Sequence, residues 1–124
     1  MAQSFDVIVI GSGPGGEGAA MQLAKQDKRV AIIESFPQLG GNCTHKGTIP
    51  SKALRHSIQM VAEYRQNPLF EKCINRMDIS WPDLLRSSNR VIEKHVTMRE
   101  RFYSRNNVEV FSGEGYFIDE HTVG

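Results

Sequence analysis

The chain has 124 residues, of which 40% are hydrophobic and 23% charged, and its formal net charge is +1. This composition is typical of one small globular domain and excludes a disordered, collagenous or disulfide-dense chain. A nearly neutral chain lacks the positive surface that binds nucleic acid, and no apolar run is long enough to span a bilayer. We therefore expect neither nucleic acid nor a membrane as a partner.

The two cysteines, Cys43 and Cys73, and the four histidines are scattered along the chain without the spacing of a metal site. The first apolar run ends in a glycine-rich loop rather than in a signal-peptide cleavage site. We therefore predict no metal, two reduced thiols and a cytoplasmic protein.

The amino-terminal part of the chain has the pattern of a strand, a helix and a second strand. Residues 5–10 form a short apolar run rich in β-branched side chains, which is typical of a strand buried on both faces of a parallel sheet. Small side chains on one face of residues 17–26 predict a helix that packs closely on this strand. Residues 30–33 predict a second buried strand, which ends at Glu34, so that these segments form a βαβ unit.

The middle of the chain alternates between loops and helices. Pro37 and the tandem glycines Gly40 and Gly41 predict a loop over residues 35–42. Apolar residues at helical spacing then predict a helix from about residue 48 to the Asn-Pro pair at 67–68. Residues 70–78 have no clear period, and we interpret them as a connector.

A capping box at residues 80–83 predicts a long helix, and the two asparagines at 106–107 predict its left-handed end. We expect strands at residues 108–111 and 116–118, a turn at 119–121 and the start of a partner strand at 122. The predicted core stripe of the long helix consists of Trp81, Leu84, Leu85, Val91, Ile92, Met98 and Phe102.

The loop at residues 11–16 has the pattern G-x-G-x-x-G between the first strand and the first helix. In this pattern Gly11 makes a tight turn, Gly13 lets the backbone approach a pyrophosphate, and Gly16 allows the helix to pack on the strand. Glu34 lies 18 positions beyond Gly16 (34 − 16), close to the spacing expected of a carboxylate that binds ribose. The strand, loop, helix and acid together predict a dinucleotide site, but they do not distinguish NAD from FAD.

The segment Gly40-Gly-Asn-Cys-Thr-His-Lys-Gly-Thr-Ile-Pro-Ser-Lys52 resembles the flavin-binding stretch G-G-T-C-x-x-x-x-C-I-P-S-K of the pyridine nucleotide-disulfide oxidoreductase family. The resemblance implies bound FAD, with Gly40 and Gly41 beside its ribityl and pyrophosphate groups. It also places Cys43 under the isoalloxazine ring and Lys52 toward flavin N5. A cation at that position would stabilise the electron-rich reduced flavin.

The family resemblance implies an α/β fold, a Rossmann-like doubly wound FAD-binding domain with a parallel sheet that is incomplete in this chain. Residues 1–124 would be the amino-terminal part of that domain, and the NAD(P)-binding and dimerisation domains of the family would be absent. We expect the full-length protein to bind nicotinamide dinucleotides and to form a homo-oligomer.

Thr48 stands where disulfide reductases of the family have their second cysteine, so no redox disulfide can form there. The variant C-T-H-x-G-T-I-P-S-K-A-L-R-H instead resembles the transhydrogenase branch of the family, in which FAD carries hydride between NADPH and NAD. Two alternatives stay open, a divergent reductase similar to dihydrolipoamide dehydrogenase and a non-catalytic FAD-binding fragment.

Lys52 and Cys43 are the candidate catalytic residues, although Cys43 without its partner also fits a simple packed thiol. We interpret His45 and His56 as polar groups outside the chemistry, and the segment at 113–115 fits either a turn or an adenine contact. The candidate cofactor-binding residues are Gly11, Gly13, Pro14, Gly15, Gly16, Glu34, Ser35, Gly40, Gly41, Asn42, Cys43, Thr48, Lys52 and Gly115.

Overall fold

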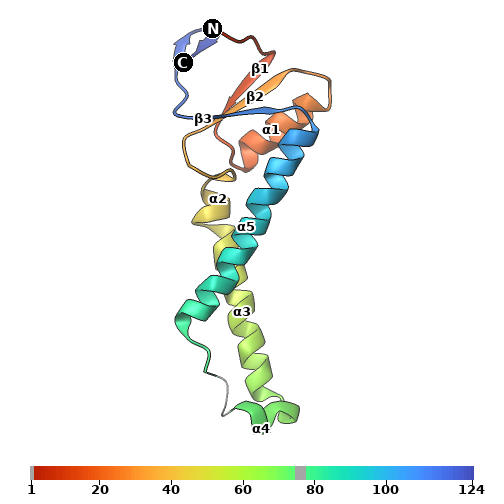
Figure 1. Cartoon of the computed structure of the whole chain (residues 1–124), viewed down its shortest axis with the longest axis vertical. Helices are drawn as coiled ribbons and strands as arrows, with labels where there is room; N and C mark the ends of the chain where they lie inside the picture. The colour runs from red at the N-terminus through yellow and green to blue at the C-terminus, as the bar shows by residue number, and fades with distance from the viewer. Residues whose placement is uncertain (1, 75–77) are drawn as a thin grey trace.

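The computed structural model describes residues 2–74 and 78–124 of the chain. Figure 1 shows a small sheet at one end and a pair of long helices that extend away from it. The elements in chain order are β1 (Val7–Ile10), α1 (Pro14–Ala24), β2 (Val30–Glu34), α2 (Gly41–His45), α3 (Thr48–Gln66), η1 (Pro68–Phe70), α4 (Glu71–Ile74), α5 (Trp81–Arg105), β3 (Glu109–Ser112), β4 (Phe117–Asp119) and β5 (Thr122–Val123).

The parallel sheet has the order β1-β2-β3, with β2 in the centre. Val30, Ala31 and Ile32 of β2 are almost completely buried, as a central parallel strand requires. The prediction that residues 5–10 are buried on both faces was wrong, because β1 is an edge strand of this sheet and Ile10 is 44% exposed. The predicted βαβ unit and the strand over 108–111 are confirmed.

Helices α1 and α5 pack on one face of the sheet. Ala20 of α1 and Tyr103 of α5 meet Val30 and Ile32 in a single apolar cluster, which Leu39 and Val108 complete. The antiparallel hairpin of β4 and β5 lies toward the opposite face, where Gly115 packs against Ile33. The predicted α/β fold with a parallel sheet is therefore present as a partial domain.

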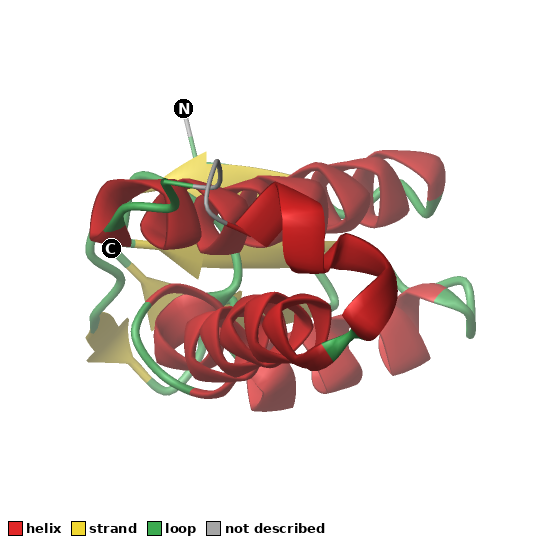
Figure 2. Ribbon diagram, turned by 90° about the horizontal axis from the view of Figure 1, so that it is seen from below, coloured by secondary structure: helices red, strands yellow, loops and turns green. Residues whose placement is uncertain are grey.

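Helices α3 and α5 lie side by side and form the extended arm of the molecule (Figures 1 and 2). The predicted capping box is confirmed, since the Ser80 backbone N–H donates to Asp83 at 2.9 Å. The predicted core stripe of α5 is partly wrong, because Trp81 is 56% and Met98 37% exposed. The amino-terminal half of α5 packs mainly on α3, whereas its carboxyl-terminal half reaches the sheet and α1. The buried residues of α5 are Ser88, Val96, Arg99 and Tyr103.

Three short helices lie where the sequence predicts loops. Helix α2 begins within the last two residues of the predicted loop 35–42, η1 ends at the first residue of the predicted connector 70–78, and α4 lies inside that connector. Such segments are too short to show an apolar period, so the sequence pattern could not reveal them. Residues 75–77 of that connector lie outside the described residues. The left-handed end of α5 is confirmed by Asn107, whose φ is 53°.

Helix α1 begins at Pro14, three residues earlier than predicted, so Gly15 and Gly16 belong to its first turn. None of the helices within residues 2–74 and 78–124 is long and apolar enough to cross a membrane.

Candidate functional site

A pocket of about 330 Å³ opens at the carboxyl ends of β1 and β2, where the loop after each strand turns toward the other. Ligands of open parallel sheets bind at this edge of the strands. The predicted residues that line the pocket are Gly11, Gly13, Glu34, Ser35, Gly41 and Asn42. The sequence interpretation missed its other lining residues, Ser12, Phe36, His45 and Lys46.

The glycine loop has two kinds of glycine. A Cβ on Gly16 would lie 2.0 Å from the carbonyl oxygen of Gly11, so this glycine is required for packing of α1 against the loop. A Cβ on Gly13 would meet no atom within 4 Å. The structure therefore provides a packing reason for Gly16 and leaves open space at Gly13, where a ligand can approach the backbone.

The amino terminus of α1 points its first backbone N–H groups toward this space. Gly13 is the N-cap residue and provides no side chain, and Pro14 follows in the first turn. The first helical hydrogen bond runs from the Glu17 N–H to the Gly13 carbonyl oxygen at 2.8 Å. Unsatisfied N–H groups and the helix dipole together favour an anion at this position.

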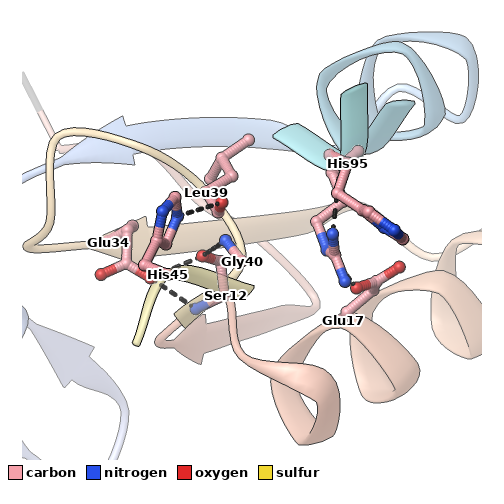
Figure 3. A network of polar contacts seen from close by, with 8 residues as sticks. Ser12, Glu17, Glu34, Leu39, Gly40, His45 and His95 are labelled. Atoms are coloured by element: carbon pink, nitrogen blue, oxygen red, sulfur yellow. Dashed lines mark hydrogen bonds and ion pairs between the residues drawn. The ribbon is translucent and has the colours of Figure 1, made fainter. Parts of the chain in front are cut away.

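Glu34 ends β2 and is buried, with only 8% of its surface exposed. Its Oε2 accepts hydrogen bonds from the Ser12 N–H at 2.8 Å and from the Ser12 hydroxyl (Figure 3). Its Oε1 accepts one from the Phe36 N–H at 2.9 Å. Burial acts to raise the pKa of this carboxyl, but the hydrogen bonds from Ser12, Phe36 and Ser35 outweigh it and hold the pKa below its usual value. Glu34 is therefore an anion in a pocket of donors at neutral pH.

The second glycine pair brings two loops into backbone contact. Gly40 and Gly41 have φ angles of 121° and 63°, which residues with a Cβ rarely adopt. A Cβ on Gly41 would lie 2.8 Å from the Cα of Gly13. The Gly40 N–H also donates to the Ser12 hydroxyl at 2.9 Å, so that Ser12 joins the second loop to Glu34.

Three of the missed lining residues, Phe36, His45 and Lys46, form one group. The His45 ring lies 4.9 Å from the Phe36 ring, and its Nε2 is 2.9 Å from the Leu39 carbonyl oxygen. The Lys46 ammonium lies 5.9 Å from the centre of the Phe36 ring. His45 is half-buried and lines the pocket, and Lys46 brings a positive charge to the same pocket.

A family model described as pyridine nucleotide-disulphide oxidoreductase matches residues 5–124, which is nearly the whole chain. The chain belongs to this family. Curated relatives include the soluble pyridine nucleotide transhydrogenases of Colwellia psychrerythraea, 54% identical, and of Yersinia enterocolitica, 53% identical. Each match covers 96% of this chain and 26% of the relative, so the chain spans about a quarter of the length of these proteins.

Solved structures of oxidoreductases in this class have the same fold. The Cu(II) complex of the HOCl-induced flavoprotein disulfide reductase RclA from Escherichia coli matches with a TM-score of 0.77 and 25% identity over 98% of this chain and 24% of that one. A second structure of RclA matches with a TM-score of 0.70 and 27% identity, over 94% of this chain and 23% of that one. The chain therefore has the fold of the corresponding quarter of these structures.

The segment of residues 40–52, which resembles the family's flavin-binding stretch, continues from the pocket into α2 and α3. Cys43 is half-buried in α2, Thr48 is the first residue of α3, and Lys52 is exposed one turn later. These three residues, and Gly115 on the far side of the sheet, do not line the 330 Å³ pocket in the described part of the chain. Gly115 instead packs on Ile33, where a Cβ would lie 3.1 Å from Cδ1 of the isoleucine.

Cys43 and Cys73 are both free thiols. They lie at opposite ends of α3, whose 19 residues correspond to about 28 Å at 1.5 Å per residue. A disulfide needs Cα atoms within about 7 Å, so Cys73 cannot replace the missing cysteine partner of Cys43 in this fold. Among the described residues, no group of three or more His, Cys, Asp and Glu side chains could hold a metal ion.

Proposed function

We propose that residues 1–124 are the amino-terminal part of the FAD-binding domain of a flavoprotein that transfers hydride between NADPH and NAD. The NAD(P)-binding and dimerisation domains would belong to a longer chain, which we propose is a cytoplasmic homo-oligomer. The transhydrogenase names of relatives that are 54% and 53% identical support this assignment. The glycine, serine and glutamate residues that line one pocket support the proposal that the chain binds FAD.

The main support for FAD binding is the open space at Gly13, beside the backbone contact between the two glycine loops. This space lies at the amino terminus of α1, and the pocket that contains Gly13 also contains Glu34 and Lys46. A diphosphate fits the helix terminus and the lysine, whereas a ribose hydroxyl fits the carboxylate. The donor set and the absence of a side chain at Gly13 therefore suit a dinucleotide.

In this assignment, the helix terminus binds the diphosphate and Glu34 accepts a hydrogen bond from the adenosine ribose. Ser12 orients the Glu34 carboxylate, since it donates twice to Oε2 and leaves Oε1 with the Phe36 N–H as its partner. When bound, FAD supplies the group that accepts and returns hydride. In this assignment Lys52 would supply a positive charge to that group, as the family resemblance implies, and would favour its electron-rich reduced form.

Thr48 supports hydride exchange over disulfide reduction. A disulfide reductase of this family relays electrons through two cysteines, and here Cys43 is half-buried without a second thiol in reach. We assign Cys43 to the flavin surface as a packed thiol. The remaining alternative, a non-catalytic FAD-binding fragment, describes the 124 residues on their own.

The test uses the complete gene product, purified with its natural cofactor. We expect the absorbance spectrum of a bound flavin, and transfer of hydride from NADPH to an NAD analogue. A colourless protein that takes up no added FAD would overturn the cofactor assignment, and a flavoprotein without transfer would overturn the transhydrogenase assignment. Release of thiols from a disulfide substrate by the reduced enzyme would favour the reductase instead.

A variant at Gly13 separates binding from folding. Its φ of −66° is allowed for alanine, and a Cβ there would meet no protein atom within 4 Å. We therefore expect Gly13→Ala to keep the thermal stability of the FAD-free protein and to lose FAD affinity. Unchanged FAD affinity would show that no cofactor approaches this backbone.

A further inference from the structure

One acidic side chain stands close to the proposed diphosphate site. Glu17 lies in the first turn of α1, and its Cα is only about 4.5 Å along the helix axis from Pro14, at 1.5 Å per residue. Helical side chains tilt toward the amino terminus, which is the end that would hold the diphosphate. A carboxylate without a cationic partner at this position would interact favourably with the helix dipole. It would also repel an anion bound at the amino terminus of the helix.

The Glu17 carboxylate is not free, because it forms an ion pair with Arg99. The Arg99 Nε donates to Glu17 Oε2 at 2.7 Å, and its Nη1 donates to the His95 carbonyl oxygen at 3.2 Å (Figure 3). The side chain of Arg99 is 9% exposed and that of Glu17 is 23% exposed. The ion pair therefore lies in a region where water screens charge weakly, and it joins two helices through residues that are 82 positions apart in the sequence.

The charges of Glu17 and Arg99 act in opposite directions on a neighbouring group, Tyr103. Tyr103 lies one helical turn after Arg99 and is 1% exposed. Burial is the main cause that raises its pKa to about 12, and Glu17 raises it further, whereas Arg99 lowers it. Glu34 is a smaller influence in the same direction as Glu17.

We propose that Arg99 is a positioning residue for the diphosphate, because it holds the Glu17 carboxylate in an ion pair and cancels its charge beside the amino terminus of α1. This inference rests on the proposed function. It assigns a role in cofactor binding to α5, which contributes no residue to the lining of the glycine-loop pocket in the described part of the chain.

The sign of the charge distinguishes this role from simple helix packing. Arg99→Gln leaves an uncompensated carboxylate next to the diphosphate, so we expect the dissociation constant for FAD to rise roughly tenfold. Glu17→Gln leaves an uncompensated guanidinium, which attracts the diphosphate, so the constant stays unchanged or falls. In the double variant, with both charges removed, it returns to within about threefold of the wild-type value.

The experiment titrates the FAD-free complete gene product with FAD and follows the quenching of flavin fluorescence. Thermal unfolding of each FAD-free variant serves as the measure of folding, and Arg99→Lys, which keeps the charge, is expected to bind FAD within about threefold of the wild type. If the ion pair only packs α1 on α5, Arg99→Gln and Glu17→Gln will weaken FAD binding to the same extent, and the inference fails.

If Arg99→Gln does not fold, Glu17→Gln decides the question on its own, since weaker FAD binding by this variant contradicts the inference and equal or tighter binding supports it. A wild-type protein that binds no FAD would contradict the proposed function itself. The two failures are therefore distinguishable.

Discussion

Ser12 donates two hydrogen bonds to the same oxygen of Glu34, one from its backbone N–H and one from its hydroxyl. Ser12 lies in the loop after β1, and Glu34 is the last residue of β2, so the two contacts tie the ends of neighbouring strands together. The same hydroxyl accepts a hydrogen bond from the Gly40 N–H at 2.9 Å. These three hydrogen bonds form one polar network at the pocket.

The hydrogen bonds that Glu34 accepts predict a pH dependence of stability. The pKa of Glu34 is held below its usual value of about 4.3, so the folded protein binds fewer protons than the unfolded chain near that pH. The stabilisation is present above that value and is lost as the pH falls through the lowered pKa. We expect the free energy of unfolding of Glu34→Gln, measured in urea from pH 6 to about pH 3, to fall less steeply than that of the wild type.

The control for this measurement is Glu100→Gln, which changes an exposed glutamate of α5. It should keep the wild-type slope. Equal slopes for the wild type and Glu34→Gln would show that the Ser12 and Phe36 hydrogen bonds do not lower the pKa of Glu34 in solution.

Two glycines of α1 provide a matched pair. Alanine at Gly16 would place its Cβ 2.0 Å from the Gly11 carbonyl oxygen, whereas alanine at Gly18 meets no atom within 4 Å. We expect Gly16→Ala to lower the free energy of unfolding by about 3 kcal/mol, through overpacking of helix on loop. Gly18→Ala should raise it by about 0.5–1 kcal/mol, since alanine favours a helix interior. Denaturant unfolding measures both, and similar effects at the two positions would contradict the packing explanation.

Lys52 is exposed at the start of α3, so its removal should leave folding unchanged. If its charge stabilises the reduced cofactor, Lys52→Met in the complete gene product should lower kcat for hydride transfer from NADPH to an NAD analogue by about tenfold or more. Lys52→Arg should keep much of the rate, because it keeps the charge. Lys94→Met, an exposed lysine of α5, is the control, and an equal loss of rate in both methionine variants would remove Lys52 from the mechanism.

The Tyr103 hydroxyl is buried and has no hydrogen-bond partner among the described residues. Tyr103→Phe keeps the ring in the apolar cluster and removes this unsatisfied group, so it should stabilise the protein by about 1 kcal/mol. The pKa of Tyr103 is raised to about 12, mainly by burial. The wild type should therefore lose further stability as the pH rises above about 10, and the variant should not.

Thermal and urea unfolding at pH 7 and at pH 10–11 measure the two effects of Tyr103→Phe. Tyr116→Phe, which changes an exposed ring, should match the wild type at both pH values. A destabilised Tyr103→Phe variant would show that the hydroxyl has a partner in solution.

The sequence predicted the site best where its geometry depends on residues that are close together in the chain. Gly16 was expected to allow close packing, and its Cβ would collide with Gly11, five residues away in the same loop. The expected carboxylate, Glu34, does reach the pocket. The lining residues His45 and Lys46 were missed, although both stand inside the quoted flavin motif. A histidine and a lysine inside that motif were the signal that could have identified these two residues.

Other relationships could not be read from the sequence because they join distant segments. Arg29, which immediately precedes β2, pairs with Glu109 of β3 at 3.0 Å, and this contact forms only because the chain returns to the sheet after α3 and α5. The exposure of residues in the predicted α5 stripe, such as Trp81, could not be predicted for the same reason. An apolar period identifies the face of a helix, but the partner that covers each turn is set by how the helices cross.

The sequence alone determined the βαβ unit, the glycine loop and the acid at the end of β2, because tight turns and the alternation of strand and helix depend on residues near one another in the chain. Its motif over residues 40–52 also gave the family. The tertiary structure decided the hydrogen bonds among Ser12, Glu34 and Gly40, the ion pair between Glu17 and Arg99, and the burial of Tyr103. These contacts are long-range, and only the packing of α1, α5 and the second glycine loop onto β2 brings their polar groups within bonding distance.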